Sequence, residues 1–232
     1  MDHLNIKILT LFRVSNLVFR IYLPMNKQHK LDKLKEKMKT DRALPLRSGA
    51  TNLVFGEGGS DTDYMFIGEG PGYWEDQKGI PFVGNAGAFL NQLISIMGKE
   101  RKDVYISNVV HFRPPQNRDP STEEIEAFQP YLDEMIEIIN PNVIVTLGRF
   151  SMAKFIPGVK ISFVHGKPRL VKWKRKDLIV VPMYHPAAGL RNPSVKMLTI
   201  EDFKNLKEEI EKVKVKLEEK REEKKTEQME LV

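Results

Sequence analysis

The chain of 232 residues contains no cysteine, and this absence sets the first limits on its chemistry. Without thiols it forms no disulfide bond, and no metal can be held by thiolates. Long apolar runs are also missing, because Lys7, Arg13 and Arg20 interrupt the apolar stretch of residues 4–24. A membrane span needs about 20 mainly apolar residues, and a central Arg is costly there. We therefore expect no span and, without a small-residue cleavage site, no signal peptide.

Positive charge is in modest excess. The 37 Lys and Arg residues outnumber the 31 Asp and Glu residues, which gives a formal charge of +6 and a pI near 9.3. This balance is compatible with a polyanionic partner but does not require one. The length suffices for one α/β domain with a full core. We expect that domain at residues 27–210, followed by a charged helix or tail at 211–232. Residues 1–26 are interpreted as a weakly structured extension, with a helix packed on the domain as the alternative.

Apolar runs alternate with helical patterns along the domain. Strands are expected near 63–67, 104–110, 143–147 and 178–183, and helices near 27–40, 85–97, 121–139, 150–156 and 200–227. A hairpin-like pair is expected at 161–165 and 169–173. Alternation of this kind predicts a three-layer α/β/α sandwich around a central, mostly parallel, four-stranded sheet.

Chemistry-bearing residues follow the ends of the expected strands. The first strand ends in the glycine-rich loop Gly68–Gly72, and Glu75 and Phe82 come shortly afterwards. Asn108 lies near the end of the second strand, and the last strand continues into the segment His185–Arg191. In α/β folds the carboxyl ends of parallel strands form the ligand-binding edge, so these side chains should lie close together.

The order and spacing of these motifs resemble the family 4 (thermostable type) uracil-DNA glycosylases over residues 40–210. The motifs are Gly68-Glu-Gly-Pro-Gly72, Glu75-Asp76, Pro81-Phe-Val-Gly84, the strand-end Asn108 and His185-Pro-x-x-x-x-Arg191. The resemblance implies a DNA repair enzyme that hydrolyses the N-glycosidic bond of uracil, leaving an abasic site for base excision repair. Two alternatives remain: a non-catalytic nucleic-acid-binding protein on the same fold, and a glycosylase for another deaminated base.

A glycosylase must flip its base out of the DNA and read the base edge in a pocket. Phe82 suits stacking on uracil, and the Asn108 amide can accept a hydrogen bond from N3–H and donate one to O4. The resemblance implies that Gly68, Gly70 and Glu75 also line the base pocket and that Glu75 helps to exclude a methyl group at C5. Ordinary core packing for Phe82 and a strand-end turn for Asn108 are the structural alternatives.

Two residues are candidates for catalysis. Cleavage places negative charge on the departing uracil and positive charge on the sugar, so a donor aimed at O2 and a group near the sugar are needed. His185 is the candidate donor, with a purely structural loop histidine as the alternative. Glu69 is the candidate that orients water or stabilises the cation. Asp76 is expected to have a structural or capping role.

The remaining expectations concern partners. Leu190 could fill the gap left by a flipped base, while Arg191, Arg113 and Arg118 are candidate phosphate contacts. We expect uracil-containing DNA, single- or double-stranded, as the partner of a monomer in the cytoplasm, associated with the nucleoid. The terminal Gln228–Val232 weakly resembles a sliding-clamp-binding pentapeptide.

The chain departs from the family at its metal centre. The resemblance implies a [4Fe-4S] cluster held by four cysteines, but Asp41, Leu44, Phe112 and Phe128 occupy the four positions. Thiolates are the ligands such a cluster requires, so we expect no cluster and no other cofactor or metal. We expect the three apolar replacements to form a hydrophobic plug instead. Gly70 also replaces the usual Ala, which predicts a slightly wider pocket.

Overall fold

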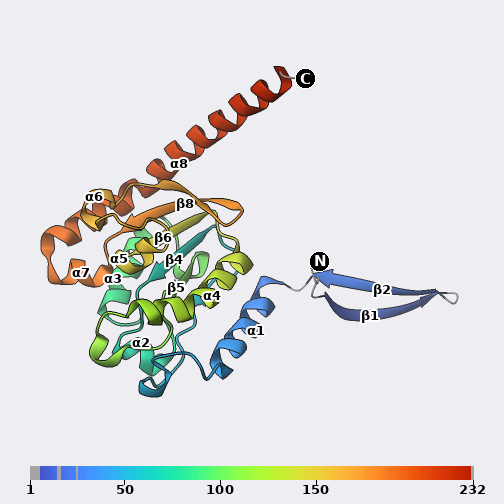
Figure 1. Ribbon diagram of the computed structural model, residues 1–232, viewed down its shortest axis with the longest axis horizontal. Helices are drawn as coiled ribbons and strands as arrows, with labels where there is room; N and C mark the ends of the chain where they lie inside the picture. Colours follow the sequence, from blue (N-terminus) through green and yellow to red (C-terminus); the bar gives the residue numbers. More distant parts are fainter. Residues whose placement is uncertain (1–5, 15–16, 25, 231–232) are drawn as a thin grey trace.

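The computed structural model describes residues 6–14, 17–24 and 26–230. Its main sheet has six strands in the order β3-β5-β4-β6-β8-β7. They are β3 (Glu57–Gly58), β4 (Tyr64–Gly68), β5 (Tyr105–Asn108), β6 (Val143–Leu147), β7 (Arg169–Trp173) and β8 (Lys176–Met183). Figure 1 labels β4, β5, β6 and β8 at the centre of this sheet. The four central strands are mutually parallel, while β3 and β7 pair antiparallel at the two edges. The predicted four-stranded parallel core is therefore confirmed, and two short edge strands extend it.

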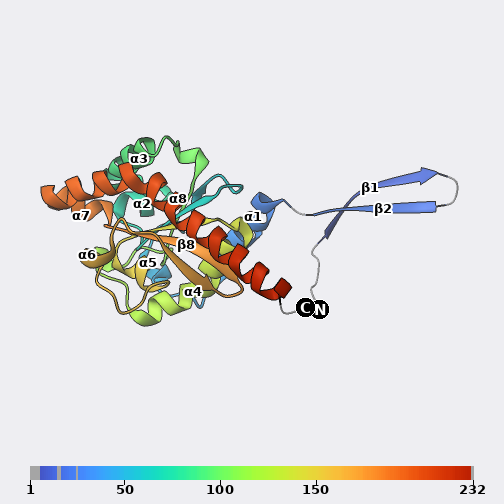
Figure 2. The ribbon, with the colours of Figure 1, turned by 90° about the horizontal axis from the view of Figure 1, so that it is seen from above.

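Helices cover both faces of this sheet (Figures 1 and 2). They are α1 (Lys27–Thr40), α2 (Tyr73–Lys78), α3 (Asn85–Ile96), α4 (Thr122–Ile139), α5 (Arg149–Ala153), α6 (Ile161–Val164), α7 (Pro186–Arg191) and α8 (Pro193–Glu230). Side chains of β4 alternate between the faces: Met65 and Ile67 pack with α1 and α4, and Phe66 packs with α3 and α8. This arrangement is the predicted three-layer α/β/α sandwich.

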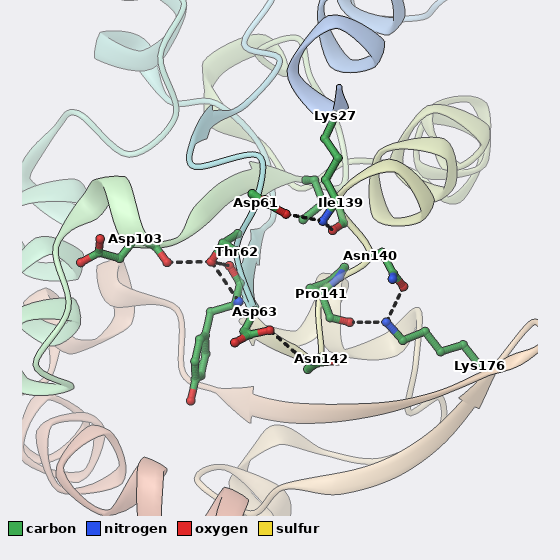
Figure 3. Close-up of polar contacts among 11 residues, drawn as sticks. Lys27, Asp61, Thr62, Asp63, Asp103, Ile139, Asn140, Pro141, Asn142 and Lys176 are labelled. Atoms are coloured by element: carbon green, nitrogen blue, oxygen red, sulfur yellow. Dashed lines mark hydrogen bonds and ion pairs between the residues drawn. The ribbon is translucent and has the colours of Figure 1, made fainter. Parts of the chain in front are cut away.

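Polar contacts join the segments at the amino ends of the parallel strands (Figure 3). Lys27 Nζ donates to Asp61 Oδ1 at 2.8 Å and to the Ile139 carbonyl at 2.9 Å, which satisfies an end carbonyl of α4. Asn142 Nδ2 donates to Asp63 Oδ1 at 2.7 Å beside the starts of β4 and β6. The glycine-rich loop Gly68–Gly72 lies on the opposite side, at the carboxyl ends of the parallel strands, which we call the carboxyl edge of the sheet.

The predicted hairpin-like pair of residues 161–165 and 169–173 was wrong in its first member. Residues 161–164 form helix α6 and not a strand; Gly166, at φ 70°, turns the chain directly afterwards. The segment 169–173 does form a strand, β7, but it pairs with β8 and not with residues 161–165, through a tight turn at Lys174, where φ is 53°.

The two ends of the chain differ from the compact domain. Strands β1 (Ile6–Val14) and β2 (Leu17–Pro24) form an antiparallel hairpin that stands apart from the sandwich in both views, so the alternative of a helix was wrong (Figures 1 and 2). Helix α8 docks through its buried Phe203, Leu206 and Ile210 and then extends beyond the domain. In the part of the chain that the structure describes, no helix is long and apolar enough to cross a membrane. The pentapeptide Gln228–Val232 lies outside the residues whose side chains are described.

Candidate active site

A cavity of about 340 Å³ opens at the carboxyl edge of the sheet. Eight of the eleven predicted site residues line it: Glu69, Gly70, Glu75, Phe82, Asn108, Arg118, His185 and Arg191. They come from the loop after β4, from α2 and the segment that follows it, from the end of β5 and the loop beyond, and from the segment His185–Arg191 after β8. The convergence expected from the strand ends is therefore observed.

Phe82 is held in a strained backbone conformation. Its φ is 52°, in the left-handed region that bulky residues rarely adopt, although its side chain is only 6% exposed. The guanidinium of Arg101 donates to the carbonyl of Phe82 at 3.2 Å and to the carbonyl of Pro81. Glu57 Oε2 accepts from Arg101 Nε at 2.6 Å and fixes this cation in turn. Arg101 therefore fixes the segment that presents the aromatic ring.

Gly68 makes room for two neighbours of the base pocket. A Cβ at this position would lie 2.4 Å from Asn108 Oδ1 and 2.6 Å from the Phe82 ring. Asn108 itself is 1% exposed, and its Oδ1 is buried with no hydrogen-bond partner among the described residues. Because buried polar atoms are almost always paired, an unpaired acceptor beside a cavity indicates a ligand donor at that point.

Glu75 connects the α2 helix to the start of α3. Its Oε1 accepts from the backbone N–H groups of Val83 and Gly84, each at 2.9 Å. Asp76 beside it points the other way, where its Oδ1 accepts from the N–H groups of Thr51 and Asn52. The expected structural role of Asp76 is therefore confirmed.

His185 is the N-cap of α7, and its protonation state follows from its surroundings. Its Nδ1 accepts from the Ala187 N–H at 3.2 Å, which assigns the proton of the neutral ring to Nε2. Burial first, and then the charge of Arg191, lower its pKa to about 4, while Glu75 opposes this shift. At neutral pH the ring is thus an uncharged Nε2–H donor.

Glu69 lies half-buried in the same cavity. Burial raises the pKa of its carboxyl above the usual value, with a further increase from Asp119, while Arg149 and Arg191 pull it down. Arg149 also forms an ion pair with Asp119. The carboxylate is thus held among opposing charges at the mouth of the cavity.

The four candidate DNA contacts differ in their exposure and in their partners within the protein. Leu190 is 45% exposed at the end of α7, as a side chain entering DNA requires, and Arg191 follows it on the cavity rim. Arg113 lies outside the cavity, with its guanidinium 5.2 Å from the centre of the Tyr73 ring. Arg118 forms a two-pronged ion pair with Glu124 at 2.6 and 2.8 Å, so its charge is already matched within the protein.

Gly70 lines the cavity, but its missing side chain would face a buried neighbour. A Cβ at residue 70 would lie 2.7 Å from Val110 Cγ2, because the missing side chain points toward the buried Val110. The absence of a Cβ at Gly70 thus leaves room for Val110, and the wider pocket stays a prediction.

The residues at the four cluster positions do not fit an iron–sulfur cluster. Leu44, Phe112 and Phe128 belong to one buried core cluster, and the rings of Phe112 and Phe128 have centroids 6.1 Å apart. Asp41 Oδ2 accepts from the Tyr131 hydroxyl at 2.6 Å. Packed hydrocarbon and an engaged carboxylate offer no ligand set for iron.

His111 is buried beside this apolar group. Its ring contacts Phe128 at a centroid distance of 5.6 Å, and its Nε2 lies 3.2 Å from Ser107 Oγ. Ser107 donates its own proton to the Phe55 carbonyl, so it accepts from His111. Burial lowers the pKa of His111 to about 3, which keeps it uncharged inside the core.

Sequence reasoning missed several contributors, namely Arg101, Asp119 and Arg149. Arg101 lies outside the motifs, and no spacing rule links it to Phe82. Arg149 follows β6, so its place after a strand end was the one available signal.

Comparisons with known proteins agree with this geometry. Residues 55–214 match the model of the uracil DNA glycosylase superfamily. A type-4 uracil-DNA glycosylase from Sulfurisphaera tokodaii is 47% identical over 184 residues, which are 77% of this chain and 84% of that protein. Proteins of the same name from Thermotoga maritima and Saccharolobus solfataricus are 44% and 42% identical, over 76% and 77% of this chain and 93% and 85% of their own lengths.

Proposed function

Because this chain belongs to the uracil DNA glycosylase superfamily and is similar over most of its length to type-4 enzymes, we propose that it excises uracil from DNA. It is a hydrolase of the N-glycosidic bond that acts in base excision repair. The observation that carries this function is the meeting of Glu69, Phe82, Asn108 and His185 in one cavity. The products are free uracil and an abasic site.

Recognition requires uracil to leave the base stack and enter the cavity. Phe82 offers its ring to the face of the base, and the unpaired Oδ1 of Asn108 accepts from N3–H. The amide nitrogen of Asn108 can then donate to O4. Glu75 borders the same cavity with its carboxylate fixed by two backbone N–H groups, where it limits the room for a methyl group at C5.

Bond cleavage leaves an electron pair on the base. As the C1′–N1 bond breaks, negative charge collects on the uracil ring, mainly at O2, and the sugar becomes cationic. The neutral His185 ring donates its Nε2–H to O2 and stabilises this charge. The imidazole need not give up its proton for this purpose.

Water then adds to the sugar cation. The ionised Glu69 stabilises positive charge at C1′ and orients a water molecule, which adds its oxygen to C1′. The proton that this water releases neutralises the departed uracil anion, so the products are neutral uracil and the abasic sugar. Arg191 and Arg149 lower the pKa of Glu69 against the effect of burial and so favour this ionised form. Arg191 and the exposed Leu190 lie where the flanking DNA would pass.

The proposal includes two finer statements: that the enzyme works without an iron–sulfur cluster, and that it acts as a monomer. The packed side chains at Leu44, Phe112 and Phe128 support the first. A defined test is release of free uracil from a single-stranded oligonucleotide, followed by chromatography. Wild-type protein should release uracil but not thymine, and Asn108→Ala should release uracil far more slowly. Equal release by both proteins would contradict the assigned role of Asn108.

A further inference from the structure

Two large aromatic side chains lie exposed beside the cavity. Tyr73 is 49% exposed and Trp74 is 58% exposed, at the start of α2. Their ring centroids are 5.1 Å apart with an interplanar angle of 78°, an edge-to-face contact. Their chain neighbours on either side, Gly72 and Glu75, both line the cavity. The pair is therefore continuous with the site that receives the flipped base.

The surroundings hold these rings in place without covering them. The guanidinium of Arg113 lies 5.2 Å from the centre of the Tyr73 ring, and its Nε donates to Asn117 Oδ1 at 2.7 Å. Trp74 Cδ1 lies against Gly84, within 3.5 Å of where a Cβ would be. Held aromatic rings lose little conformational entropy when a flat partner stacks on them.

The chemistry of the pair matches an unstacked nucleobase. Every base has a π-face that stacks on aromatic side chains irrespective of sequence, and single-strand-binding proteins combine such rings with cations that attract the backbone. Here the cation is Arg113, whose guanidinium also makes a cation–π contact with the Tyr73 ring. A nucleotide next to the flipped uracil must lie close to the cavity mouth.

We propose that Tyr73, Trp74 and Arg113 form a stacking platform for the base adjoining uracil on the same strand. This inference rests on the proposed excision of uracil. In a duplex the adjoining base is already stacked and paired, so the platform contributes most on single-stranded DNA.

The first test compares two single-stranded oligonucleotides. One carries uracil between ordinary nucleotides, and the other carries uracil between two abasic analogues that have no base to stack. Trp74→Ala should lower kcat/KM on the first by about tenfold, a typical effect of losing one stacked base. On the second oligonucleotide the variant and the wild type should be equal. Trp74→Phe, which keeps a ring, should recover most of the loss.

Phe163→Ala is the matched control, because Phe163 is an aromatic residue 70% exposed on α6 and absent from the cavity lining. It should match wild type on both substrates. An equal loss by Trp74→Ala on both substrates would overturn the platform and indicate that Trp74 merely supports the turn at Gly84. No loss on either would also overturn it. Failure of wild-type protein to release uracil from either would instead contradict the proposed function.

The second test measures DNA binding by tryptophan fluorescence, with an oligonucleotide that the enzyme cannot cleave. The chain has two tryptophans, so Trp173→Phe leaves Trp74 as the sole indole fluorophore. An oligonucleotide with 2′-fluorodeoxyuridine, which resists cleavage, should quench that fluorescence when ordinary bases flank it. The same oligonucleotide with abasic neighbours should bind with little quenching. Equal quenching by both would overturn the assignment.

Discussion

The rings of Phe82 and His185 have centroids 5.6 Å apart and are inclined by 30°. One residue precedes α3, and the other caps α7 after β8, so their proximity exists only once the sheet has brought both segments to its carboxyl edge. A base stacked on Phe82 is thereby delivered within reach of the imidazole. In the proposed mechanism, base recognition and leaving-group stabilisation therefore depend on one pair of adjacent side chains.

Gly68→Ala should abolish most activity. The new Cβ would lie within 2.6 Å of both Asn108 and Phe82, so one of the two must move out of its binding position. Displacement of about 1 Å in an active site can cost about 100-fold in rate, and we expect a loss of that size in kcat/KM. Gly49→Ala is the matched control, since a Cβ there meets nothing within 4 Å. Full activity of Gly68→Ala would contradict the geometry of the pocket.

Arg101→Ala should slow uracil release while the fold remains. Its guanidinium holds the carbonyls of Pro81 and Phe82, and Phe82 has a strained φ that needs such support. We expect kcat/KM to fall about tenfold, equivalent to about 1.4 kcal/mol. Lys102→Ala removes a neighbouring charge that pairs with the exposed Glu100 and should leave kcat/KM unchanged. Equal effects of the two substitutions would argue against a positioning role.

The activity should fall at acid pH because Glu69 becomes protonated. Burial raises the pKa of Glu69 above 4.5, and the proposed chemistry needs the ionised form, so activity is lost as pH falls through that raised value. His185, with a pKa of about 4, stays neutral over the same range. Glu69→Gln should be slower at neutral pH and nearly independent of pH between 5 and 8. If the activity of Glu69→Gln still falls at acid pH as that of wild type does, another group is responsible for the loss.

Phe128→Ala should destabilise the protein strongly. Its ring is fully buried against Phe112 and His111, and removal of a buried phenylalanine ring costs about 3–5 kcal/mol of unfolding free energy. The exposed Phe163→Ala should change the same quantity by less than about 0.5 kcal/mol. Urea unfolding of the two variants measures both. Similar stabilities would mean that the apolar plug does not replace the cluster as a structural element.

His111 should make the fold sensitive to acid. Its pKa is lowered from 6.5 to about 3 by burial, so below pH 6.5 the unfolded chain binds a proton that the folded chain does not. The unfolding free energy should therefore decrease as pH falls from 6.5 toward 3. His111→Phe removes this contribution, and its unfolding free energy relative to wild type should rise over the same interval. A pH-independent difference between the two proteins would contradict the assigned burial of the neutral ring.

The sheet and the centre of the site could be predicted from the sequence, because both follow from the order of the strands. Parallel strands must end at one edge, so residues placed after β4, β5 and β8 had to meet there. The sequence also marks the start of α4, because Ser121 and Glu124 form a capping box there.

The remaining features depend on contacts between distant segments. Arg101 reaches Phe82 across 19 residues, and no periodic pattern reports such a contact. Arg118 was expected at phosphate, but its partner Glu124 becomes apparent only when the loop folds back on the start of α4. The direction of the missing Gly70 side chain depends on Val110, a neighbour in space alone.

This fold should excise uracil although its cluster position is filled with packed side chains. The most direct measurement is alkali-induced breakage of a uracil-containing oligonucleotide by protein shown by elemental analysis to be free of iron, beside His185→Ala and Asn108→Ala. We predict breakage by the iron-free protein that both substitutions weaken strongly. Intact DNA after incubation with iron-free protein that still binds it would contradict the account.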